Sequence, residues 1–168
     1  MEFATLLLLH SFFGILWAGG AIAVGFFVIP SVMEAGPGGG AVMAGVMKRR
    51  FPVFMTASAV LVVLSGLRLY SIRFSAAFLG TPEGIALTLG GLLGVGAFFI
   101  GVFVQRPMAG KLGTLAATVA AQGRPPTPEQ SAELDQIRAR LGRIGRLTAW
   151  HLVLSAFLMA SHRLAAML

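Results

Sequence analysis

The segment FATLLLLHSFFGILWAGGAIAVGFFVI, residues 3–29, contains no Asp, Glu, Lys or Arg. A helix needs roughly 20 predominantly apolar residues to cross a bilayer, so this segment is long enough to span one. Three more apolar segments follow, at about residues 53–72, 84–105 and 147–168. Only 11% of the 168 residues are charged, whereas soluble domains contain about a quarter. The sequence therefore predicts an all-α integral membrane four-helix bundle, with residues 1–168 forming a single membrane domain.

Two features of the sequence limit which kinds of targeting segment and cofactor site are possible. The amino terminus carries Glu2 and no Lys or Arg before the apolar run, which favours a retained span over a cleavable signal peptide. Cysteine is absent, which excludes disulfides, thiolate metal sites and covalent c-type haem attachment. Histidine is then the strongest metal ligand available, apart from Met.

The net charge of +7 is concentrated in two of the three connections between spans. Ten of the thirteen basic residues lie there: Lys48, Arg49, Arg50, Arg106, Lys111, Arg124, Arg138, Arg140, Arg143 and Arg146. The positive-inside rule places these connections in the cytoplasm and both termini outside, in a multi-pass protein of a bacterial-type inner (plasma) membrane. Topology and attraction to anionic membrane lipid account for the basicity, so no nucleic acid is expected as a partner.

The third connection, residues 106–146, has helical composition on both sides of a break at RPP. Thr127 is a predicted N-cap, with Pro128 at the first helical position and Gln130 closing a capping box. Leu134 and Ile137 begin an amphipathic face. We expect the third and fourth helices to extend beyond the bilayer as a cytoplasmic helical hairpin. In the first connection, Pro30 is expected to end the first helix and GPGGG to form a flexible stretch.

Three histidines lie within the apolar segments. His10 shares a stripe with small residues and Trp17, and such stripes face the interior of a membrane bundle. His151 and His162 are eleven residues apart and share one face of the last helix, about 16 Å apart along its axis. With both termini outside, His10 and His162 lie at similar depths near the outer surface, and His151 lies near the cytoplasmic end.

Two inward histidines at one level suit axial ligation of a haem. His10 and His162 are therefore the candidate haem ligands, Trp17 is a candidate contact of the cofactor, and Arg68 is a candidate partner for a propionate. Arg163 also contributes positive charge near this level. Copper held by the same histidines is the alternative, with His151 as a third candidate metal ligand. Each of these residues also has a purely structural interpretation. The histidines would then only hydrogen-bond a neighbouring Ser or carbonyl, Trp17 would only pack, and Arg68 would only anchor its helix at the membrane interface.

Two quoted segments resemble a known family. LHSFFGILWAGGAIAVGFFVIP, residues 9–30, resembles the first helix of CopD-like (copper resistance D) membrane domains and of HemJ-like protoporphyrinogen oxidases. KRRFPVFMTASAVLVVLSGLRLY, residues 48–70, resembles the second-helix region of small CopD-like proteins. The resemblance covers residues 1–70 and implies a four-helix core. For the HemJ-like branch it implies haem or porphyrin bound at His10.

The leading functional prediction is a membrane protein that binds haem b through histidines and serves electron transfer or porphyrin handling. If the protein is an enzyme, it is an oxidoreductase. Copper handling and a non-catalytic accessory subunit of a larger membrane complex remain as alternatives. The partners compatible with the sequence are membrane lipid, a membrane protein, or further copies of the chain in a homo-oligomer.

Overall fold

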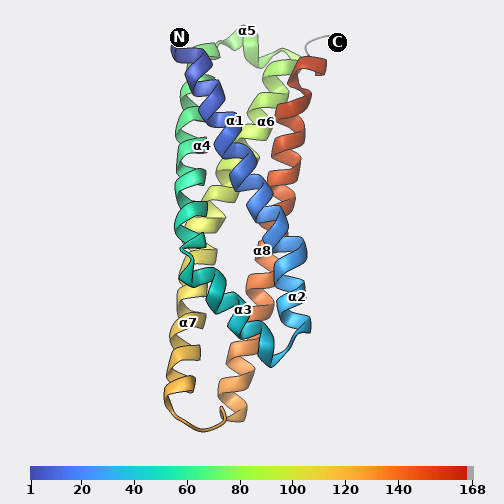
Figure 1. Ribbon diagram of the computed structural model, residues 1–168. Coiled ribbons are helices and arrows are strands. Elements are labelled where there is room, and N and C mark those ends of the chain that lie inside the picture. The colour runs from blue at the N-terminus through green and yellow to red at the C-terminus, as the bar shows by residue number, and fades with distance from the viewer. Residues whose placement is uncertain (166–168) are drawn as a thin grey trace.

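The computed structural model describes residues 1–165, all of whose regular elements are helical (Figure 1). The elements are α1 (Glu2–Ala23), η1 (Val24–Val28), α2 (Ile29–Glu34), α3 (Pro37–Lys48), α4 (Phe51–Arg73), α5 (Ala76–Leu79), α6 (Pro82–Ile100), η2 (Gly101–Gln105), α7 (Arg106–Ala121) and α8 (Pro128–Ala165), where η marks a π-helical turn. The last residues of the fourth predicted span, 166–168, lie outside the described part, as does the side chain of Arg163.

Four continuous helical stretches are long and apolar enough to cross a membrane: Glu2–Glu34, Phe51–Arg73, Pro82–Ala121 and Pro128–His162. The first three contain the predicted apolar segments and the fourth covers residues 147–162 of the last one, so the prediction of four potential spans is confirmed. Met1 and the end of α8 lie at the same end of the molecule, which we call the terminal end (Figure 1). The turn between α7 and α8 lies at the other end, the hairpin end.

Pro30 does not end the first helix, contrary to the prediction. The chain widens into the π-turn η1 and continues as α2, with Pro30 in its first turn. Pro107 is likewise preceded by the π-turn η2 and lies in the first turn of α7. Proline has no N–H to donate, and its ring collides with the carbonyl four residues earlier. A π-turn moves that carbonyl aside, so the helix continues past the proline.

The GPGGG segment is also more ordered than predicted. Gly36 has a φ of 56°, which permits a tight turn, and Pro37 then begins α3, so the following glycines are helical. Gly39 packs so closely on Val32 that a Cβ would overlap its carbonyl oxygen. Close packing against α2 therefore explains why glycine occurs inside this helix.

The centre of the molecule is a cluster with one residue from each long stretch: Trp17, Ala59, Ala97 and Leu152. Glycines allow close helix contacts around it. A Cβ on Gly25 would lie 3.1 Å from the Cβ of Ala149, and one on Gly90 would lie 3.2 Å from the carbonyl oxygen of Ser155. Gly25 of the first span and Gly90 of the third therefore lie against neighbouring helices.

A band without acidic or basic side chains surrounds this cluster. On α4 it extends from Arg50 to Arg68, which corresponds to about 27 Å at 1.5 Å per residue. On the α6–η2–α7 stretch it extends from Glu83 to Arg106, about 34 Å along a tilted helix. These lengths match the hydrocarbon core of a bilayer, which is about 30 Å thick.

Beyond the band, α7 and the first half of α8 lie antiparallel to each other and extend to the hairpin end (Figure 1). The predicted capping box is present, because the Thr127 N–H donates to Gln130 Oε1 at 3.0 Å and the Gln130 N–H to Thr127 Oγ1 at 3.3 Å. Leu134 and Ile137 are buried. Lys111 and Glu133 join α7 to α8 with an ion pair of 2.8 Å. Capping, burial and this pair together stabilise the extension outside the charge-free band.

Candidate functional site

His10 projects from α1 onto α4. Its Nδ1 lies 2.9 Å from the carbonyl oxygen of Val62 and 3.4 Å from Ser65 Oγ. A carbonyl can only accept, so Nδ1 carries the proton that it donates to Val62. In the neutral ring, Nε2 then has a free lone pair.

Gly66 provides the space for this ring. A Cβ at Gly66 would lie 2.7 Å from Cε1 of His10, 3.1 Å from Nδ1 and 3.7 Å from Nε2. No larger residue fits there unless the ring moves. Ser65 keeps its own hydroxyl proton within α4, where Oγ donates to Leu61 O at 2.5 Å. The backbone and small side chains of α4 therefore fix the orientation of His10.

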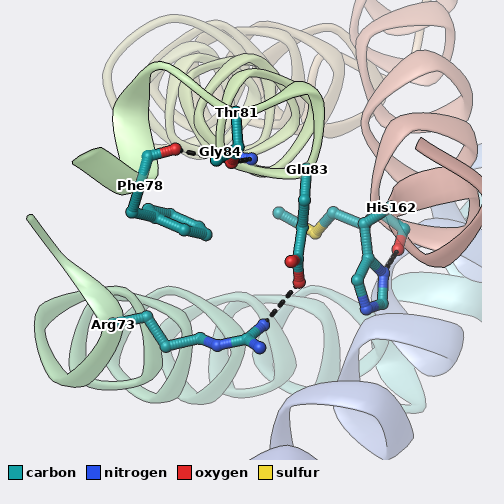
Figure 2. Close-up of polar contacts among 7 residues, drawn as sticks. Arg73, Phe78, Thr81, Glu83, Gly84 and His162 are labelled. Carbon is teal, nitrogen blue, oxygen red and sulfur yellow. Dashed lines mark hydrogen bonds and ion pairs between the residues drawn. The ribbon is translucent and has the colours of Figure 1, made fainter. Parts of the chain in front are cut away.

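His162 has the same protonation pattern. Its Nδ1 lies 2.6 Å from the carbonyl oxygen of Met159, one turn earlier on α8, so Nδ1 donates and Nε2 is the nitrogen with the lone pair. Figure 2 shows the His162 ring projecting to the same side as Glu83, whose carboxylate pairs with Arg73.

The helical rise gives the depth of the two residues. His10 is seven residues from Trp17 and His162 is ten from Leu152, both toward the terminal end. These separations correspond to about 10 and 15 Å along their helices. Both histidines therefore lie on the same side of the central cluster, within about 5 Å of each other in height.

His151 lies elsewhere. It precedes Leu152 of the central cluster and is five residues from Arg146, or about 8 Å along α8, so it lies nearer the hairpin end than His162 does. The Nδ1 of His151 donates to Leu147 O at 2.8 Å, within its own helix.

Trp17 and Arg68 both have partners within the chain. Trp17 is 7% exposed and packs in the central cluster. Arg68 forms an ion pair with Glu2, with Nη2 and Oε1 2.7 Å apart. This pair joins α4 to α1 near the terminal end.

A second arginine at the terminal end was not singled out from the sequence. Arg73 Nη1 lies 2.7 Å from Glu83 Oε1, and its guanidinium lies 6.0 Å from the centre of the Phe3 ring and 5.9 Å from that of Phe78. A sequence signal existed, because Glu83 is the only acidic residue between Glu34 and Glu129. Ser65 and Gly66 were also missed, since their importance depends on which residue of α1 faces them.

The described residues contain no group of three or more His, Asp or Glu side chains able to hold a metal ion. Two cavities, of about 370 Å³ between α7 and α8 and about 320 Å³ between α2 and α3, lie away from His10 and His162. A metal site in this region therefore rests on the two histidines alone. No known protein family, curated protein or solved structure matches the chain.

Proposed function

We propose that this chain is a haem b-binding protein of a bacterial-type inner membrane, with His10 and His162 as the axial ligands. In this proposal the four long helices form a membrane bundle, the α7–α8 extension is cytoplasmic, and both termini are outside. The function would be electron transfer or porphyrin handling, and any catalytic activity would be that of an oxidoreductase.

The observation that carries the proposal is the orientation of His10. Histidines that bind metals usually donate their other ring N–H to a carbonyl or carboxylate, which fixes the tautomer and increases the basicity of the ligating nitrogen. His10 makes this contact with Val62 on a neighbouring helix. A contact between helices orients a ring more firmly than one within its own helix, so Nε2 of His10 is prepared for ligation.

Position supports His162 as the second ligand. It lies on the same side of the central cluster as His10, on a helix from the other half of the chain. Neutral imidazole is a common axial ligand of haem. The donor set thus fits a bis-histidine haem, which would supply one-electron redox chemistry when bound.

Space for a macrocycle would come from the seam between the two helix pairs. α1 packs along α4, and α6 along α8, whereas α4 and α6 touch at few positions. At the terminal end the pairs are joined by Tyr70–Thr88, whose hydroxyl oxygens are 2.7 Å apart, and by Arg73–Glu83. Separation at these two contacts would open the seam toward His10 and His162. Arg68 would have to leave Glu2 to bind a propionate.

The test is the absorption spectrum of the detergent-purified protein, together with its haem and metal content. One haem per chain and a low-spin Soret spectrum support the proposal. Stoichiometric copper without haem would replace it with copper handling. A preparation that contains neither, and that binds no added hemin, would exclude both and leave an accessory role.

A further inference from the structure

The basic residues at the two borders of the charge-free band differ in whether they form ion pairs. At the terminal end, Arg68 and Arg73 are paired with Glu2 and Glu83. At the opposite border, five exposed basic residues form what we call the basic belt: Lys48, Arg49, Arg50, Arg106 and Arg146. Within residues 1–165, none of the observed ion pairs includes a member of this belt. Its charge is therefore available to an anion from outside the chain.

The belt lies at one level although its members come from three parts of the sequence. Arg50 and Arg106 are each nine residues from the central cluster, at Ala59 and Ala97, or about 14 Å along their helices. Arg146 lies six residues from Leu152, or about 9 Å. Gln105, next to Arg106, donates from Nε2 to Oγ1 of Thr148, two residues after Arg146, at 2.8 Å. This hydrogen bond brings the parts of the chain that carry Arg106 and Arg146 together.

The helix that leads into the belt has an exposed apolar surface. On α3, Val42 is 56% and Met47 is 43% exposed. A cavity of about 320 Å³ lies between α3 and the η1–α2 segment, lined mainly by apolar side chains that include Phe27, Val28 and Val32. A helix with an apolar exposed face that ends in Lys48 and Arg49 is typical of a segment lying in a membrane interface.

The junction between α3 and α4 adds positive charge to the same place. Arg50 adopts a left-handed conformation, with φ 57° and ψ 26°, and directs the chain into α4 without a side-chain cap for that helix. The uncapped N-terminus of a helix has a positive partial charge. Arg49 Nη1 donates to Gly45 O at 3.0 Å, which holds its guanidinium beside the end of α3.

We propose that the basic belt and α3 bind the headgroup of an anionic phospholipid, with acyl-chain density along the cavity between α2 and α3. Charge complementarity identifies the anion, and the exposed apolar surface beside the belt favours lipid over a soluble acidic protein. The level of the belt, at the border of the charge-free band, is where bilayer phosphates lie. This proposal does not depend on haem binding.

The experiment measures lipid preference in the full chain. Purified protein is titrated with phosphatidylglycerol and phosphatidylcholine of identical acyl chains, and retained lipid is counted by native mass spectrometry. At 0.5 M salt the charges of the belt are screened, so the preference for phosphatidylglycerol should decrease. K48Q/R49Q/R50Q should reduce it by at least ten-fold, since each basic residue near an anionic surface contributes about a five-fold change. The charge-conserving R49K/R50K should retain most of it.

A matched control removes the same charge elsewhere. R124Q/R138Q/R140Q lies in the extension and should leave the preference within two-fold of the unmodified chain. An equal loss in both triple variants, or no preference for phosphatidylglycerol at all, would overturn the proposal. If the first variant does not fold, R106Q/R146Q tests the same belt. Displacement of the lipid by millimolar glycerol phosphate would assign the site to a free anion and also overturn it.

Discussion

The imidazole of His10 on α1 lies directly against Gly66 on α4, where a Cβ would come within 2.7 Å of the ring. Gly66→Ala should therefore displace the ring or separate the two helices. Such overpacking costs about 1–3 kcal/mol. The midpoint of thermal unfolding in detergent should decrease, and any haem spectrum should lose intensity or shift.

Gly14 and Gly91 provide the matched controls. A Cβ at either position would meet no other atom within 4 Å, and alanine favours a helix over glycine by about 1 kcal/mol. Gly14→Ala and Gly91→Ala should leave the thermal midpoint unchanged or raise it slightly. A Gly66→Ala variant as stable as these controls would show that His10 is not confined as described.

The axial-ligand prediction concerns all three histidines. His10→Ala and His162→Ala should each abolish or convert a low-spin haem spectrum, because either change removes one of two axial imidazoles. His151→Ala should leave it nearly unchanged, since His151 lies about 16 Å from His162 along α8 and donates within its own helix. Optical and electron paramagnetic resonance spectra of the three variants provide the measurement. Loss of haem from His151→Ala alone would refute the pairing.

The sequence predicted those parts of the fold that depend on local patterns. The four apolar segments, the Thr127 capping box and the inward position of Trp17 follow from hydropathy, capping chemistry and helical periodicity. The continuation of the first helix past Pro30 was missed, because a π-turn depends on how the surrounding helices hold the backbone. The contacts of His10 with Val62 and Gly66 were inaccessible for a related reason: they depend on the register between α1 and α4, which no local pattern specifies.

The Arg73–Glu83 pair should stabilise the terminal end more than the Arg68–Glu2 pair does. The side chain of Glu83 is 20% exposed, compared with 61% for Glu2, and exposed ion pairs contribute at most about 1 kcal/mol. Arg73 also stacks near two aromatic rings, and such contacts contribute about 0.5–1 kcal/mol at exposed sites. Arg73→Gln should therefore lower the thermal midpoint more than Arg68→Gln. A double-mutant cycle with Glu83→Gln separates the ion pair from the stacking, and zero coupling would show that the pair contributes nothing.

Membrane orientation and the accessibility of the extension can be tested together. Ten basic residues lie in the first and third connections, so a reporter fused after Leu168 should be active only in the outer compartment. Protease added from the cytoplasmic side should cut first between α7 and α8, at residues 122–127, because this connection is not helical and Gly123 has a φ of 60°. The glycines at 38–40 should resist cleavage, because α3 includes them. Early cleavage there, or cytoplasmic activity of the fused reporter, would contradict the proposed arrangement, and the second result would also move His10 and His162 to the cytoplasmic half of the membrane.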